Sequence, residues 1–249
     1  MKKCFFCGGP GGNEEHVISE SVRRRMQITE VEIESGIRDG DGYGQFRKPH
    51  RFERLVTHEV CDACNRGWMS QLEIDFLAAV SRLIEPDWPK SDAELIREAM
   101  KRSNVIARWA VKTAVTASLA GVLENRIPQE IAIDLRNGKL PEPLVVKVGH
   151  IRQRDFNLLM NPGFKFMDDG EKWKVSESGK AFDAVFQLNH FAIRAVNAPA
   201  VEIGFDASGG LLPLSAFPVV RDAPFSEYSF ESFEDFELRL FARLLSTER

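Results

Sequence analysis

The four cysteines of the chain fall into two close pairs, and this feature limits most strongly what the chain can fold into. Cys4 and Cys7 form one Cys-x-x-Cys pair, and Cys61 and Cys64 form the other. Each pair can place two thiolates on one ion, and two pairs complete the tetrahedral Cys₄ shell that Zn²⁺ prefers. The sequence shows no export signal, which favours zinc over disulfides. We therefore expect these cysteines to bind one structural zinc ion; the alternative is four buried cysteines without a metal.

Length and charge limit the function more loosely. A chain of 249 residues suits one large domain or two modest ones. Its formal net charge of −4 argues against a positively charged coat, so any contact with nucleic acid has to come from local patches. The sequence has no apolar run of about 18 residues that would span a membrane. We therefore expect a cytoplasmic protein without a membrane partner.

The pattern of apolar and turn-forming residues predicts a first module over residues 1–85, ending at a proline-rich segment, 86–89. Its expected elements are a glycine-rich turn at 8–12, a short strand at 17–18, a polar insertion at 23–54 with room for a hairpin, a second strand at 55–60 and a helix from about 64 to 83. The helix is predicted by an apolar face at helical spacing: Trp68, Leu72, Phe76 and Ala79.

Residues 86–249 are expected to form an α+β domain of unknown role. Ser91 and Glu94 fit a helix-capping box, and the proline-free segment to about residue 123 predicts one long helix or two with a bend. Beyond it, alternating apolar residues and turn signals predict mainly antiparallel strands. The expected strands lie at 144–148, 181–188, 191–196 and 201–205, and a closing helix lies at 234–245.

An acid-histidine pair, Glu15 and His16, lies between the two cysteine pairs and is followed by Val17. With the cysteines around it, this segment resembles the HNH endonucleases, whose ββα-metal site is built on a treble-clef zinc knuckle. The resemblance implies a module of that fold, with His16 as general base and Glu15 as a ligand of a catalytic Mg²⁺ or Mn²⁺. Asn65, directly after Cys64, falls at the second metal-ligand position. The implied substrate is nucleic acid, with DNA preferred over RNA.

Two further segments extend the resemblance to a set of bacterial HNH-like proteins of unknown activity. They are residues 65–73 (NRGWMSQLE) and 109–114 (WAVKTA). Trp68, Met69 and Leu72 are most simply core residues of the helix. Glu73 lies two turns from Asn65, so it could face the metal.

The chain departs from the HNH pattern at two positions. The middle Asn of the pattern would lie near Val56, where the chain has none, and the polar substitutes on the same predicted strand are His58 and Glu59. Either could orient His16 or bind metal, and either could equally face solvent. In addition, Glu15 replaces the commoner Asp. A zinc-stabilised nucleic-acid or protein-binding module without catalysis is therefore the competing hypothesis.

Basic residues in the predicted helical segment form a candidate nucleic-acid contact. Four of them fall within an arc of about 60° on a helix that turns 100° per residue: Arg97, Lys101, Arg108 and Lys112. The alternative is a solvated helix face, with these cations paired to acids such as Glu94 and Glu98. Two further basic clusters, at 23–25 and 47–51, have acidic residues interleaved with them.

Overall fold

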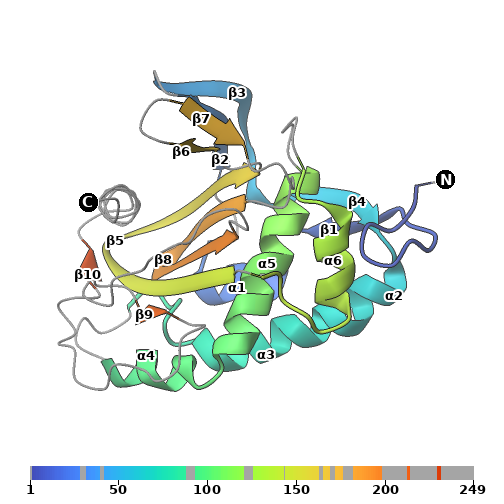
Figure 1. Cartoon of the computed structure of the whole chain (residues 1–249). Helices are drawn as coiled ribbons and strands as arrows, with labels where there is room; N and C mark the ends of the chain where they lie inside the picture. Colours follow the sequence, from blue (N-terminus) through green and yellow to red (C-terminus); the bar gives the residue numbers. More distant parts are fainter. Residues whose placement is uncertain are drawn as a thin grey trace.

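A computed structural model shows a protein of mixed helices and small, largely antiparallel sheets (Figure 1). It describes residues 2–28, 32–39, 42–87, 93–120, 126–142, 144–162, 165–168, 172–175, 182–197, 212–213 and 229–230. The strand expected at 201–205 and the helix expected at 234–245 lie outside the described residues, as do Ser91 and the side chain of Glu94. Within the described ranges, every helix is too short or too polar to span a bilayer.

The first cysteine pair lies on a tight loop that is fastened to a two-stranded sheet. Strand β1 (Asn13–His16) pairs antiparallel with β4 (Val56–Val60). Strand β4 is the second strand of the module, which the sequence predicted at 55–60. The strand expected at 17–18 is placed too late, because the pairing already ends at His16 and only one backbone bond, from Val17 N to Leu55 O, continues it. Val17 and Ile18 are instead buried in the core beyond the strand.

The helix predicted after the second cysteine pair is present, but it is not regular throughout. It begins as α2 (Asp62–Cys64), passes through a π-helical turn, η2 (Asn65–Met69), and continues as α3 (Ser70–Val80). Gly67 inside that turn has a non-helical backbone, which marks a kink between the two α-helical parts. The predicted apolar face is correct in outline, since Leu72 and Phe76 are buried.

The polar insertion contains the hairpin for which the sequence has room, together with a helix that the sequence did not predict. The hairpin consists of β2 (Glu32–Asp39) and β3 (Gly42–Arg51), followed by a 3₁₀ turn, η1 (Phe52–Arg54). The additional helix is α1 (Glu20–Met26), which has Ser19 as its N-cap. An acid in its first turn and the three arginines 23–25 in its last turn complement the helix dipole.

The sequence predicted either one long helix or two helices with a bend after residue 90. The structure has two, because a turn at 101–102 separates them. These are α4 (Ala93–Met100) and α5 (Ser103–Ala120). Helix α5 is buried over most of its length and contacts α3, β4 and the large C-terminal sheet, while the short α6 (Gln129–Arg136) packs beside it (Figure 1). Helix α5 therefore joins the cysteine-bearing part of the chain to the C-terminal sheet.

The C-terminal sheet is built on two long antiparallel strands, β5 (Leu144–Pro162) and β8 (Phe182–Asn197). The strands expected at 181–188 and 191–196 are thus one strand. It passes through Asn189 in the left-handed region, at φ 57°, where the register with β5 shifts. Shorter strands complete the sheets: β9 (Leu212–Pro213) and β10 (Ser229–Phe230) pair with β5, and β6 (Lys165–Asp168) pairs with β7 (Lys172–Val175).

One cluster of buried apolar side chains extends from Cys4 to Ala195 and includes residues on both sides of the expected boundary at 85–86. Its centre is a stack of Phe76 from α3 on Trp109 from α5, with ring centroids 3.9 Å apart and planes 4° apart. Phe186 of β8 meets the same indole edge-on. The described residues on the two sides of that boundary therefore share one core.

Candidate functional site

The four cysteines converge on one point, as the pairing of Cys-x-x-Cys motifs predicts. Their sulfur atoms all lie within 4.8 Å of one another, and the four thiols are free. Four thiolates about 2.3 Å from a tetrahedral zinc ion would be separated by about 3.8 Å. The donor set and the spacing therefore fit a metal ion of the zinc type.

Backbone hydrogen bonds shape the loop that presents the first pair. Cys4 N donates to Gly9 O at 2.7 Å, and Gly8 N donates to Cys4 O at 2.8 Å. Gly8 has a φ of 73°, which glycine adopts without strain. At Gly11 a Cβ would lie 2.9 Å from the backbone of Lys3 and Cys4, so a larger residue would push the loop apart.

The second pair is positioned by the start of a helix. Cys61 is the N-cap of α2, and its sulfur accepts a hydrogen bond from Cys64 N at 3.4 Å. Although burial raises the pKa of Cys61, this backbone donor and the neighbouring cysteines lower it to about 7. Burial raises the pKa values of Cys4 and Cys64. A bound cation would compensate that burial by stabilising the thiolates.

Glu15 and His16, the acid-histidine pair of β1, face opposite sides of the sheet. Glu15 is buried, at 7% exposure, and it pairs with Thr57 of β4. The side chain of His16 is 34% exposed, and its Nε2 lies 3.8 Å from Oε1 of Glu14. Because side chains alternate along a strand, Glu14 and His16 share the outer face of the sheet while Glu15 points inward.

Asn65 is brought to the same strand from the helical side. It is the first residue of the π-helical turn, and its Nδ2 donates to the backbone carbonyl of Glu14 at 3.0 Å. The two residues that the resemblance assigns to the base and to the second metal ligand therefore lie on neighbouring elements. This hydrogen bond also fastens the helix to β1.

The position opposite His16 is Val56, where the HNH pattern would have its middle Asn. Valine has no hydrogen-bonding group, and Nδ1 of His16 is buried without a hydrogen-bond partner among the described residues. His58 is exposed on β4, and Glu59 forms an ion pair with Arg126 at 2.9 Å. Neither substitute makes a described hydrogen bond to His16.

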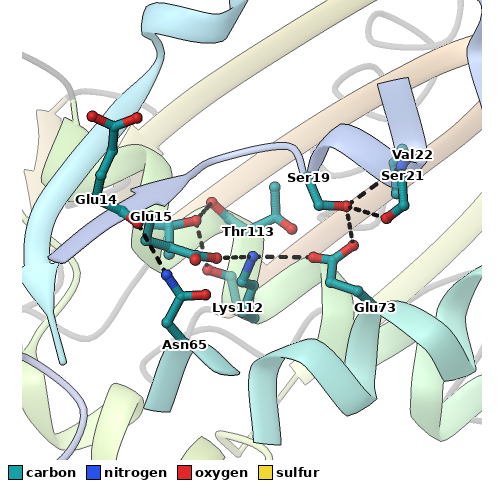
Figure 2. Close-up of polar contacts among 10 residues, drawn as sticks. Glu14, Glu15, Ser19, Ser21, Val22, Asn65, Glu73, Lys112 and Thr113 are labelled. Atoms are coloured by element: carbon teal, nitrogen blue, oxygen red, sulfur yellow. Dashed lines mark hydrogen bonds and ion pairs between the residues drawn. The ribbon is translucent and has the colours of Figure 1, made fainter. Parts of the chain in front are cut away.

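Glu15 belongs to a buried chain of polar contacts, shown in Figure 2. Lys112 of α5 is fully buried, and its Nζ lies 2.7 Å from Glu15 and 3.0 Å from Glu73 of α3. The hydroxyl of Ser19 donates to the other oxygen of Glu73 at 2.8 Å. Burial by itself would lower the pKa of Lys112, but the charges of Glu73 and Glu15 outweigh burial, so the pKa lies above its ordinary value. Lys112 is therefore a buried ammonium ion.

The structure corrects the predicted basic stripe. Lys112 is fully buried and is not available to a nucleic acid, and Arg108 is half-buried on the same helix. Arg97 and Lys101 are exposed, but Lys101 forms an ion pair with Glu98, which is the alternative that the sequence left open. A uniform arc was predicted because 97–112 was treated as one helix, and the turn at 101–102 breaks it.

The basic cluster at residues 23–25 is largely neutralised. Arg23 is buried and lies 3.5 Å from Glu53, Arg24 pairs with Glu20 at 2.5 Å, and Arg25 pairs with Glu85. The side chains of the second cluster, 47–51, lie outside the described part apart from Arg51, which is exposed.

Sequence reasoning missed the contacts of Lys112 and Ser19. Most neighbours of Lys112 in the segment 105–120 are apolar. A lysine that is buried among such residues has to pair with an acid inside the protein. The sequence does not show which acid, because Glu15, Glu73 and Lys112 lie far apart along the chain.

No known family model matches the chain, and no curated protein or solved structure shows significant similarity to it. The HNH resemblance therefore stays a prediction that depends on the residues of the chain itself.

Proposed function

We propose that residues 1–85 form a zinc-stabilised treble-clef ββα-metal module of the HNH type, and that the protein is an endonuclease acting on DNA in preference to RNA. The observation that supports this most directly is the hydrogen bond from Asn65 to β1 at Glu14. It joins the residue after the last cysteine to the strand that carries His16. A base and an amide ligand are thus available next to a four-cysteine site, in the order that the resemblance requires.

In this proposal His16 is the general base for phosphodiester hydrolysis. Its Nδ1 is buried, so Nε2 is the nitrogen that would take a proton from water. Accepting a proton at Nε2 requires the neutral ring to carry its hydrogen on Nδ1. The exposed carboxylate of Glu14 lies 3.8 Å from Nε2, on the same face of the strand.

The residues fit the catalytic divalent ion only in part. The side-chain oxygen of Asn65 is a suitable donor for Mg²⁺ or Mn²⁺. Glu15, the expected acidic ligand, does not fit, because its carboxylate already contacts a buried ammonium ion and is only 10% exposed.

The test is a cleavage assay of the zinc-loaded protein on plasmid DNA, single-stranded DNA and RNA, with Mg²⁺ or Mn²⁺ and with a chelator as control. The first prediction is that His16→Ala lowers the cleavage rate by about 10²–10⁴-fold, because a general base contributes that much. The variant should retain zinc and the wild-type melting temperature. Absence of cleavage by the wild-type protein under all these conditions would reject the endonuclease.

A second candidate is a zinc-stabilised module that binds nucleic acid or protein without cutting. The specific observations in its favour are the pairing of Glu15 with Lys112 and the valine opposite His16. Binding of fluorescent duplex DNA by an uncleaving wild-type protein, with an affinity that falls as salt rises, would support this candidate for nucleic acid.

A further inference from the structure

We propose that Lys112 is a positioning residue: by holding Glu15 inside the protein, it fixes the face of β1 that is exposed and so directs His16 outward. The inference rests on the proposed function only for its activity readout. Its structural readout, the environment of the His16 ring, is independent of whether the protein cuts nucleic acid.

The sequence of β1 explains why such a device is needed. All four residues of the strand, Asn13 to His16, are polar, and two adjacent positions are glutamates. The register of a strand is usually set by the apolar side that it buries, and a shift of one residue moves every side chain to the other face. Within β1 no apolar side chain makes that choice, and the first apolar residue, Val17, is buried just beyond the end of the strand. The pairing with β4 is itself irregular, with a shift between Asn13 and Glu15.

Lys112 makes that choice within the strand itself. Its ammonium is fully buried and lies on α5, a helix that packs against α3, β4 and the C-terminal sheet and carries the stacked Trp109. An ammonium inside a protein requires an anion, so one glutamate of β1 is drawn inward. That glutamate is Glu15, at 2.7 Å, while Glu14 remains 57% exposed beside His16. Figure 2 shows Glu15 and Glu73 pointing toward Lys112 from opposite sides, with Glu14 pointing away.

The same contacts join the three segments that carry the family resemblance. Glu15 belongs to the acid-histidine segment, Glu73 to residues 65–73 and Lys112 to residues 109–114. The resemblance treats Glu15 as a metal ligand and leaves the lysine without a role. In the structure these residues share one buried cluster, which Ser19 extends to the start of α1. Glu15 and Glu73 are then anchors of Lys112, and the lysine links β1, α3 and α5.

The experiment compares Lys112→Met, which removes the charge at nearly constant length, with Lys101→Met, the same change at an exposed lysine. The ring signals of ¹³C-labelled histidine are recorded by NMR and assigned with His16→Gln. We expect Lys112→Met to move the His16 signal or split it into several, while Lys101→Met leaves it unchanged. Both variants should still bind one zinc ion per chain. An unchanged His16 signal in folded, zinc-bound Lys112→Met would overturn the proposal.

The cleavage rate of Lys112→Met distinguishes two roles of Glu15: ligand of the divalent ion, or buried partner of Lys112. If Glu15 bound the divalent ion, removing Lys112 would free its carboxylate and lower the Mn²⁺ concentration needed for cleavage. Positioning instead predicts that kcat falls about tenfold to a hundredfold in Lys112→Met, with little change in KM and no recovery at higher Mn²⁺. If the wild-type protein does not cleave, the proposed function fails, and the NMR comparison still decides the role of Lys112.

A milder pair of variants covers the case in which Lys112→Met does not fold. Glu15→Gln and Glu73→Gln each remove one carboxylate charge from the same lysine, but only Glu15 lies on β1. Exchange of β1 backbone amides with deuterium should accelerate in Glu15→Gln and stay near wild type in Glu73→Gln. Equal acceleration in both variants, or in neither, would contradict the positioning role.

Discussion

At the scale of single residues, the surroundings of a side chain decide its chemistry more than its type does. Glu14 and Glu15 are adjacent and chemically identical, yet one is exposed beside His16 and the other is buried against Lys112. The four cysteines can likewise bind a metal ion only because the fold brings their sulfur atoms together. Sulfur atoms within 4.8 Å of one another, on a loop and a helix start, form a site that a tetrahedral ion can fill.

The residue-scale prediction concerns the metal. Cys61→Ser should lose most of the bound zinc and lower the free energy of unfolding, because metal binding is part of the folding free energy of such a site. Zinc content by mass spectrometry and urea unfolding measure both effects. Treating the wild-type protein with a chelator should reproduce the destabilisation, and added zinc should reverse it. A Cys61→Ser protein with one zinc ion per chain and unchanged stability would contradict the prediction.

At the scale of elements, strand β8 depends on one residue at its irregular point. Asn189 has a φ of 57°, and its Nδ2 donates to Met26 O at 3.0 Å and to Ile84 O at 2.6 Å. Arg154 Nε donates to its side-chain oxygen at 3.1 Å. The amide therefore satisfies two buried carbonyls. One belongs to the last residue of α1 and the other lies four residues beyond the end of α3, so Asn189 ties both segments to the sheet.

The element-scale prediction separates the two contributions of Asn189. Asn189→Gly keeps the backbone conformation but leaves the two carbonyls without their donor, at a cost of about 1–3 kcal/mol. Asn189→Ala should be less stable than Asn189→Gly by a further ~1 kcal/mol, because alanine is disfavoured in the left-handed region. Urea unfolding of both variants measures the difference. Equal stability of the two variants would show that the strand relaxes at this point.

At the scale of the whole molecule, the cysteine-bearing part depends on a helix that follows it in the chain. Phe76 stacks on Trp109, and Glu15 and Glu73 share Lys112; both partners lie on α5. Without α5, the apolar face of α3 would be uncovered and two carboxylates would lose their counterion.

The molecular-scale prediction follows from that dependence. A fragment of residues 1–85 should bind zinc without a cooperative unfolding transition, whereas the full chain should unfold cooperatively. Thermal unfolding followed by circular dichroism, with zinc present, makes the comparison. A fragment that melts cooperatively at the wild-type temperature would show that the zinc module is an independent domain.

The sequence by itself determined the features that depend on neighbouring residues. Cysteine spacing predicted the four-sulfur cluster, and helical spacing predicted the helix after Cys64. The pattern of apolar and turn-forming residues predicted the strand at 55–60, and the glycine-dotted insertion allowed the hairpin of β2 and β3. Spacing within a pair and periodicity within an element are local, so they can be read without the fold. The short helix α1 was not predicted, because its charged residues are typical of a polar insertion and Ser19 was not recognised as an N-cap.

Only the tertiary structure decided which way polar residues face. The stripe of Arg97, Lys101, Arg108 and Lys112 satisfied helical spacing, yet a turn interrupts it and Lys112 points into the core. Periodicity cannot assign Lys112 to the interior, because its anions come from β1 and α3, far away in sequence. For the same reason an all-polar strand could not show which glutamate is buried. The packed core decides which glutamate is buried, because an unpaired charge inside the protein costs too much free energy.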